Sequence, residues 1–256
     1  MKSLVRFIAN SEFGVRLRNA LNIKPQLYNR NIPRSSSVSD SFAWRTDNSY
    51  KTIFKFSDIL DLFYDVKNSY VELSFFNKNN KFIKSIKIND LNLSNSLSID
   101  KDFFSGLEDY GYFNIFHHSD DLKISNDIIS NRCYLGFSYK ENLYSFVHGN
   151  TFATYFNNNN KTIGEDVIKT SLIKNQIYKI QKCFDGYDRV ELFVNNPTTK
   201  KIYFSVNNNK YELNSKCSKI IHINKEEKEA NIKSNCAYLR PVVFTYKQDY
   251  IDVHHS

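Results

Sequence analysis

Residues 70–88 have the sequence YVELSFFNKNNKFIKSIKI, which indicates the fold class of the chain. Val71, Leu73 and Phe75 alternate with more polar neighbours, and the same period of two resumes after the polar cluster at 77–81. A period of two is typical of β-strands, whose side chains point alternately to opposite faces. Asparagine tolerates the positive φ values that tight turns require, so this cluster suits a turn with no glycine. The stretch therefore predicts a β-hairpin.

The same pattern continues through the rest of the chain. Residues 134–139 and 142–147 form a second predicted hairpin, and polar clusters at 195–199 and 207–209 supply two further predicted turns. Short strands separated by turn signals every 8–12 residues or so are typical of antiparallel sandwiches. We therefore expect an all-β protein.

An internal repeat refines this expectation. Several short blocks occur twice in the same order: Val71–Leu73 with Val190–Leu192, Ser130–Leu135 with Ser234–Leu239, and Phe137–Lys140 with Phe244–Lys247. Repeated blocks in one order indicate duplication of a structural unit. The prediction is two tandem related antiparallel β-sandwich modules, Ig-like or jelly-roll-like, at 42–156 and 174–256, with a junction at 157–173.

The net charge of +8 is concentrated at the N-terminus. Residues 1–45 hold eight basic and two acidic groups, which gives +6, whereas the other 211 residues hold 27 basic and 25 acidic groups, which gives +2. Apolar residues recur at loosely helical spacing in the first 21 positions, and a stretch rich in Pro and Ser follows. Residues 1–41 are therefore predicted to be a short basic, partly helical arm with an extended, poorly packed linker.

Three roles for this arm follow from its composition. It is a solvated helix that docks weakly on the body, a helix whose residues 1–24 lie on a membrane surface, or a transit peptide or nucleic-acid-binding arm. Nucleic acid is not an expected partner of the folded body, because the body is nearly neutral.

Several function classes are excluded by missing motifs. The chain has no GxxxxGK[ST], no GxGxxG and no GxSxG, and its four cysteines form no CxxC pair. No apolar run approaches the length of about 20 residues that crosses a bilayer, and Arg6 interrupts the apolar segment that a signal peptide would need. A cytoplasmic or peripheral membrane location is therefore expected.

Histidine and aspartate suggest a metal site. Asp252 and His254 are two residues apart, as are His118 and Asp120, and His117 lies beside the second pair. Residues at i and i+2 of a strand share a face, and His with Asp suits a divalent transition metal. Adjacent histidines on a strand point to opposite faces, however, so both rings of a His-His pair cannot bind one ion. We therefore expect no cofactor. A metal-dependent enzyme that uses these His and Asp side chains is the alternative hypothesis.

The single tryptophan lies in a polar setting. Trp44 is followed by Arg45 and Asp47, and such a group can stack on a sugar ring while the polar side chains bond its hydroxyls. The alternative is that Trp44 is buried and holds the arm against the first module. The leading hypothesis is a non-catalytic recognition protein that binds carbohydrate or a cell-surface component. Its expected partner is therefore a glycan or another protein. A structural subunit whose basic arm contacts a membrane or nucleic acid is the third hypothesis.

Overall fold

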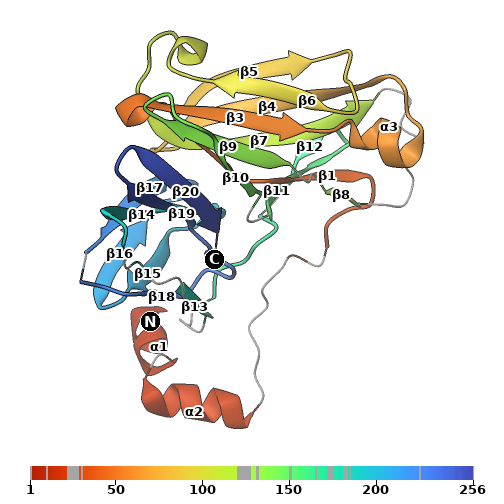
Figure 1. The fold of residues 1–256 in the computed structure, drawn as a ribbon. Helices are drawn as coiled ribbons and strands as arrows, with labels where there is room; N and C mark the ends of the chain where they lie inside the picture. The colour runs from red at the N-terminus through yellow and green to blue at the C-terminus, as the bar shows by residue number, and fades with distance from the viewer. Residues whose placement is uncertain are drawn as a thin grey trace.

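The computed structural model describes residues 2–9, 11–21, 29, 31–119, 128–130, 133–149, 152–164, 166–171, 176–180, 184, 186–224 and 226–255. Within these residues the chain is mostly strand, arranged in five four-stranded sheets (Figure 1). Nearly all pairings are antiparallel; β1 with β8 is a parallel pair. The prediction of an all-β protein built from antiparallel sheets is confirmed.

The elements of the first part of the chain are α1 (Lys2–Ala9), α2 (Glu12–Ala20), β1 (Ser36–Asp40), β2 (Phe42–Arg45), β3 (Tyr50–Phe56), α3 (Ile59–Tyr64), β4 (Ser69–Asn77), β5 (Phe82–Ile88), β6 (Asn95–Ile99), β7 (Tyr110–Ser119), β8 (Ile128–Ser130), β9 (Tyr134–Tyr139), β10 (Ser145–His148), β11 (Phe152–Asn157) and β12 (Thr162–Ile163). Two 3-10 turns, Asp47–Ser49 and Asp102–Phe104, lie among them. The second part contains β13 (Gln176–Ile180), β14 (Arg189–Asn195), β15 (Ile202–Val206), β16 (Asn209–Leu213), β17 (Ser218–Ile223), β18 (Ala230–Ser234), β19 (Val242–Lys247) and β20 (Tyr250–His255).

The predicted hairpin at 70–88 is confirmed. Strands β4 and β5 pair antiparallel with Val71 opposite Ile88, and Asn80 in the connecting turn has a φ of 62°. The hairpin of β9 and β10 is confirmed as well, with Lys140 and Glu141 at positive φ. Turns without glycine therefore form at the positions that the polar clusters indicated.

The two halves have the same strand order. In the first half the sheets run β2-β7-β4-β5 and β10-β9-β3-β6, and in the second they run β13-β18-β15-β16 and β20-β19-β14-β17. Matching the strands in chain order makes β3 correspond to β14, β4 to β15, and β9 to β19. Each pairing in the first set then has its counterpart in the second.

This correspondence differs from the alignment of sequence blocks. Val71–Leu73 lies in β4, whereas Val190–Leu192 lies in β14, whose counterpart by pairing is β3. The cluster at 195–199 is not a hairpin turn, because it connects strands of different sheets. Only the last hairpin of each half is aligned with its counterpart. A period of two is common to all strands, so a match that slips by a whole strand costs little similarity.

The arm also differs in part from its prediction. Helices α1 and α2 confirm its helical character, but residues 36–40 form a buried strand that pairs with β11 and β8, so the prediction of a poorly packed linker is wrong there. Backbone N–H groups of Ile115 and His117 donate to the hydroxyls of Ser39 and Ser37 at 2.9 and 3.1 Å. A serine-rich strand can be buried because its hydroxyls satisfy the backbone of β7.

One hydrophobic core crosses the boundary between the halves. A single buried cluster contains Phe54, Leu73 and Phe113 of the first half together with Phe193 and Phe244 of the second. A separate cluster fills the space between the two sheets of the second half. The central strands of this second-half sheet, β14 and β19, are therefore buried on both faces, one toward each cluster. Figure 1 shows the sheet β20-β19-β14-β17 on the side of the second half that lies nearest the first.

Candidate functional site

Trp44 lies in the core and not on the surface. Its side chain has no exposed area, and its Nε1 donates to the backbone carbonyls of Phe76 at 2.9 Å and Tyr112 at 3.2 Å. The ring packs on Phe104 at a centroid distance of 4.5 Å. Trp44 is therefore a buried residue that holds β2 against the first-half core, and its ring has no exposed surface on which a sugar could stack.

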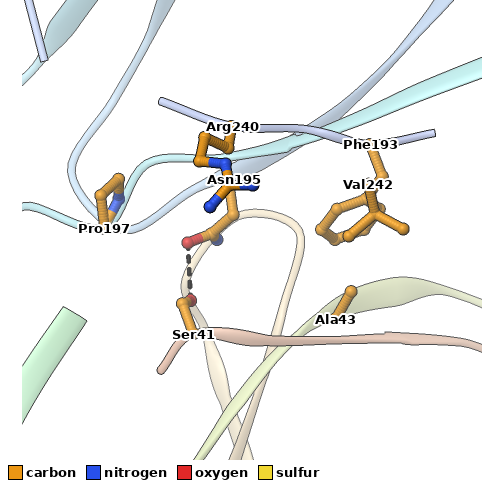
Figure 2. Close-up of a pocket in the computed structure, with 7 residues that line it drawn as sticks. All are labelled: Ser41, Ala43, Phe193, Asn195, Pro197, Arg240 and Val242. Carbon is orange, nitrogen blue, oxygen red and sulfur yellow. Dashed lines mark hydrogen bonds between the residues drawn. The ribbon is translucent and has the colours of Figure 1, made fainter. Parts of the chain in front are cut away.

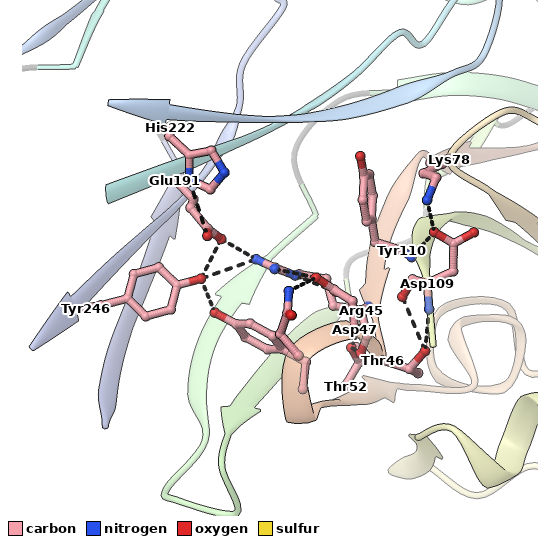
Figure 3. Close-up of polar contacts among 12 residues, drawn as sticks. Arg45, Thr46, Asp47, Thr52, Lys78, Asp109, Tyr110, Glu191, His222 and Tyr246 are labelled. Carbon is pink, nitrogen blue, oxygen red and sulfur yellow. Dashed lines mark hydrogen bonds and ion pairs between the residues drawn. The ribbon is translucent and has the colours of Figure 1, made fainter. Parts of the chain in front are cut away.

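Arg45, from the same expected site, joins the two halves. Its guanidinium forms two bonds to the carboxylate of Asp47, at 2.9 and 2.8 Å, and one to Oε2 of Glu191 on β14 at 2.7 Å (Figure 3). The same Oε2 accepts from the hydroxyl of Tyr246 at 2.5 Å, and that hydroxyl accepts from Tyr50 at 2.5 Å. Arg45 and Asp47 therefore bind each other, and Arg45 binds Glu191 as well, in an ion-pair network at the junction.

The network also explains the titration of its members. Burial favours a neutral Glu191, yet the charge of Arg45 and the hydrogen bonds from Tyr246 and Arg45 outweigh it and hold the pKa of Glu191 below its usual range. Burial raises the pKa of Tyr246 to about 12. The guanidinium also lies 3.9 Å from the centroid of the Tyr50 ring. The charges of Arg45, Asp47 and Glu191 are all paired within the network. We therefore interpret the network as a structural contact between the two halves.

The predicted metal ligands fall in two separate strands. His117 and His118 lie on β7, and Asp252 and His254 lie on β20; Asp120 lies outside the described residues. His118 stacks on the ring of Tyr70 and meets the ring of Phe156 edge to face, and Nε2 of His117 lies 3.0 Å from the carbonyl oxygen of Ser57. Within the residues that the structure describes, no group of three His, Cys, Asp or Glu side chains is placed to hold a metal.

A small cavity lies at the junction of the halves. Figure 2 shows Ser41 and Ala43 on one side and Phe193, Asn195 and Val242 on the other, and the hydroxyl of Ser41 donates to Oδ1 of Asn195 at 2.6 Å. Its volume of about 20 Å³ is enough for one water molecule. Ligand pockets of about 300–1,000 Å³ are far larger, so this cavity is a packing feature.

The outer face of sheet β10-β9-β3-β6 presents a different surface. Strand alternation sends Phe54, Leu135 and Val147 into the core, and their neighbours point outward. Register places the outward residues in two rows across the sheet. We call this surface the outer face, and its members are Ser96, Lys55, Tyr134 and His148 in one row and Ser98, Ile53, Gly136 and Phe146 in the next.

Aromatic rings are exposed along this outer face. Tyr134 on β9 is 57 % exposed and Phe146 on β10 is 43 % exposed. Tyr144, 37 % exposed, directly precedes β10, and its ring lies 6.1 Å from that of Phe146. The ammonium of Lys55 lies 5.1 Å from the centroid of the Phe146 ring. Exposed rings beside cationic and hydroxyl groups form an amphipathic surface.

Glycine at position 136 allows the Phe146 ring to lie across the sheet. A Cβ at Gly136 would lie 2.6 Å from the Phe146 ring and 2.6 Å from Cγ2 of Ile53. No real Cβ shows such short contacts, so a side chain here would displace the ring. The position of the Phe146 ring therefore depends on the absence of a side chain at position 136, its partner on β9.

Two histidines connect this face to the second half. Nε2 of His255 lies 2.9 Å from Nδ1 of His148, and the guanidinium of Arg240 lies 3.0 Å from Nδ1 of His255. A guanidinium only donates, so Nδ1 of His255 accepts the hydrogen bond from Arg240. Nε2 of His255 then carries the hydrogen and donates it in a hydrogen bond to Nδ1 of His148. The row that contains Tyr134 thus ends at a fixed contact between the halves.

The sequence interpretation missed this outer face. The signal was present in the alternation from Tyr144 to His148, where Phe146 and His148 share one face, but an apolar residue on a strand ordinarily indicates the core face.

No family model matches the chain, and neither a curated protein nor a solved structure matches it.

Proposed function

We propose that the protein is a non-catalytic recognition protein, built from two related β-sandwich modules, whose outer face binds a glycan. One observation carries the proposal: the rings of Tyr134, Tyr144 and Phe146 are exposed together on one side of a sheet. Large exposed apolar groups that gather on one surface mark interaction sites more often than single scattered ones.

A glycan suits the chemistry of this face better than a purely apolar ligand. A sugar ring has an apolar C–H side that packs on an aromatic ring, and hydroxyls at its edge that need donors and acceptors. Lys55, His148 and the serines of β6 supply such groups beside the rings. Lys51, on the same side of β3, pairs with Glu141 at 2.8 Å and adds both signs of charge at the rim.

The position of the rings on strands supports tight orientation. The opposite side of the same sheet packs Phe54, Phe137 and Val147 into the core shared by the two halves. A surface backed by a rigid core loses little conformational freedom when a ligand binds. The shared core is therefore part of the proposed role, since it fixes the platform.

The experiment uses the full chain on an array of neutral and acidic glycans, followed by calorimetric titration of the strongest ligand. Tyr134→Ala and Phe146→Ala are each expected to weaken binding by about tenfold or more, because each removes a ring worth on the order of 1–3 kcal/mol of contact. Two matched controls place the same changes elsewhere: Tyr250→Ala on β20, 58 % exposed, and Phe82→Ala on β5, 55 % exposed.

Both controls are expected to bind as the unaltered protein does. The proposal is overturned if no glycan binds. It is equally overturned if a glycan binds and neither Tyr134→Ala nor Phe146→Ala weakens it.

A further inference from the structure

The two N-terminal helices expose an unusual amount of apolar surface. Phe7 on α1 is 76 % exposed and Phe13 on α2 is 73 % exposed. Seven large apolar side chains within 18 residues are exposed: Leu4, Val5, Phe7, Ile8, Phe13, Leu17 and Leu21. A helix that is merely solvated has no physical reason to carry so many, because each costs free energy in contact with water.

These side chains follow a helical stripe. On α2 and the residue after it, Phe13, Leu17 and Leu21 recur every four positions and therefore lie on one side of the helix. Arg16 and Arg18 flank Leu17 in sequence, so they lie on either side of this stripe, about 100° away in each direction. On α1, Leu4, Phe7 and Ile8 share a side in the same way.

The charge of the segment selects the partner. Residues 2–21 hold four basic groups and a single acidic one, Glu12. An apolar stripe bordered by arginines is complementary to a surface with acyl chains below and negative headgroups above. Nucleic acid would use the cations and leave the apolar stripe in water.

We infer that α1 and α2 bind the surface of an anionic lipid bilayer, with their apolar stripes among the acyl chains and their arginines at the headgroups. The helices have eight and nine residues, and no helix in the described part of the chain is long and apolar enough to cross a membrane. They would therefore lie in the plane of the interface. Figure 1 shows both helices at the bottom of the view, outside the five sheets. This inference is independent of the glycan proposal, because it uses a different surface.

The experiment measures co-sedimentation of the full chain with vesicles of phosphatidylcholine alone or with about one third phosphatidylserine. We expect binding to the anionic vesicles that falls as salt rises from about 0.1 to about 0.5 M, since screening shortens the range of the attraction. Phe7→Glu and Phe13→Glu are each expected to reduce the partition coefficient by about tenfold or more, because each replaces a ring that would lie among the acyl chains with a negative charge. The paired change Arg16→Gln with Arg18→Gln is expected to reduce binding to anionic vesicles only.

The matched control is Leu143→Glu, at an apolar side chain that is 82 % exposed on the β9–β10 connection. It is expected to bind vesicles as the unaltered protein does. Failure to bind anionic vesicles overturns the inference, as does binding that neither Phe7→Glu nor Phe13→Glu weakens. The inference is also overturned if the protein binds a duplex oligonucleotide as tightly as it binds anionic vesicles and both phenylalanine variants keep that binding. Nucleic acid would then be the partner of the two helices.

Discussion

Asp40 provides a stability prediction with an unusual sign. Its side chain is buried at the end of β1, where the pairing with β11 shifts register, and it lies against Gly149. Among the described residues its Oδ1 has no hydrogen-bond partner. Burial without a compensating charge raises the pKa of the carboxyl from 3.8 to about 7.

The raised pKa determines how stability changes with pH. Between pH 3.8 and about 7 the folded protein holds a proton on Asp40 that the unfolded chain has released, so the free energy of unfolding falls as pH rises through this window. At about 1.4 kcal/mol per pH unit, the whole effect is roughly 4 kcal/mol and is complete above about pH 7. Carboxylates that are paired with a cation or hydrogen-bonded act in the opposite direction, Glu191 among them.

The perturbation that isolates this effect is Asp40→Asn, which keeps the shape and removes the charge. Urea unfolding monitored by circular dichroism at several pH values between 4 and 8 gives the free energy of unfolding of both proteins. The variant is expected to be more stable by up to roughly 4 kcal/mol at pH 8, with the difference shrinking to less than about 1 kcal/mol at pH 4. A difference that does not change with pH, or a variant that is less stable at pH 8, would refute the assignment of a buried, uncompensated carboxyl.

Three further predictions concern other parts of the fold. Glu191→Gln should lower the free energy of unfolding by roughly 3–5 kcal/mol, because Arg45 is left buried with one carboxylate fewer, whereas Lys51→Met, at the exposed pair with Glu141, should change it by less than about 1 kcal/mol; equal effects in urea unfolding would contradict the network. Gly136→Ala should cost about 1–3 kcal/mol and weaken glycan binding as strongly as Phe146→Ala does, and unaltered binding would show that the ring need not lie over position 136. Asp58→Ala should cost about 0.5–2 kcal/mol in a thermal or urea melt, since its carboxylate accepts from the N–H groups of Leu60 and Asp61 at the start of α3, and no loss would mean that water caps that helix equally well.

Local sequence patterns predicted the strands well, because alternation and Asn-rich turns act over a few residues. The hairpin at 70–88 and the one at 134–147 form as expected. The order of strands in the sheets could not be predicted in this way. It depends on which strands pair across long separations, such as β3 with β9. The repeated blocks also match β4 to β14 instead of β15, because all strands share one period.

The contacts of the candidate site come from residues far apart in the chain. Arg45 and Asp47 were expected to bind a ligand beside Trp44, yet nothing in their local sequence indicates Glu191, which lies 146 positions from Arg45 and completes their network. The exposure of Trp44 was likewise undetermined, because an aromatic residue among polar neighbours suits either a surface or an anchor. Phe146 is the converse case: it looks like a core residue, and its exposure follows from the way Gly136 admits its ring across the neighbouring strand.

The proposed binding surface is the outer face of the sheet β10-β9-β3-β6. The most direct test is titration of the best array glycan into the isotopically labelled full chain, observed by two-dimensional NMR of backbone amides. The largest shifts are expected on β9, β10 and the outward positions of β3, around Tyr134 and Phe146, and Phe146→Ala is expected to abolish them. Shifts confined to β5 or to the second half, with the outer face unchanged, would contradict this proposal.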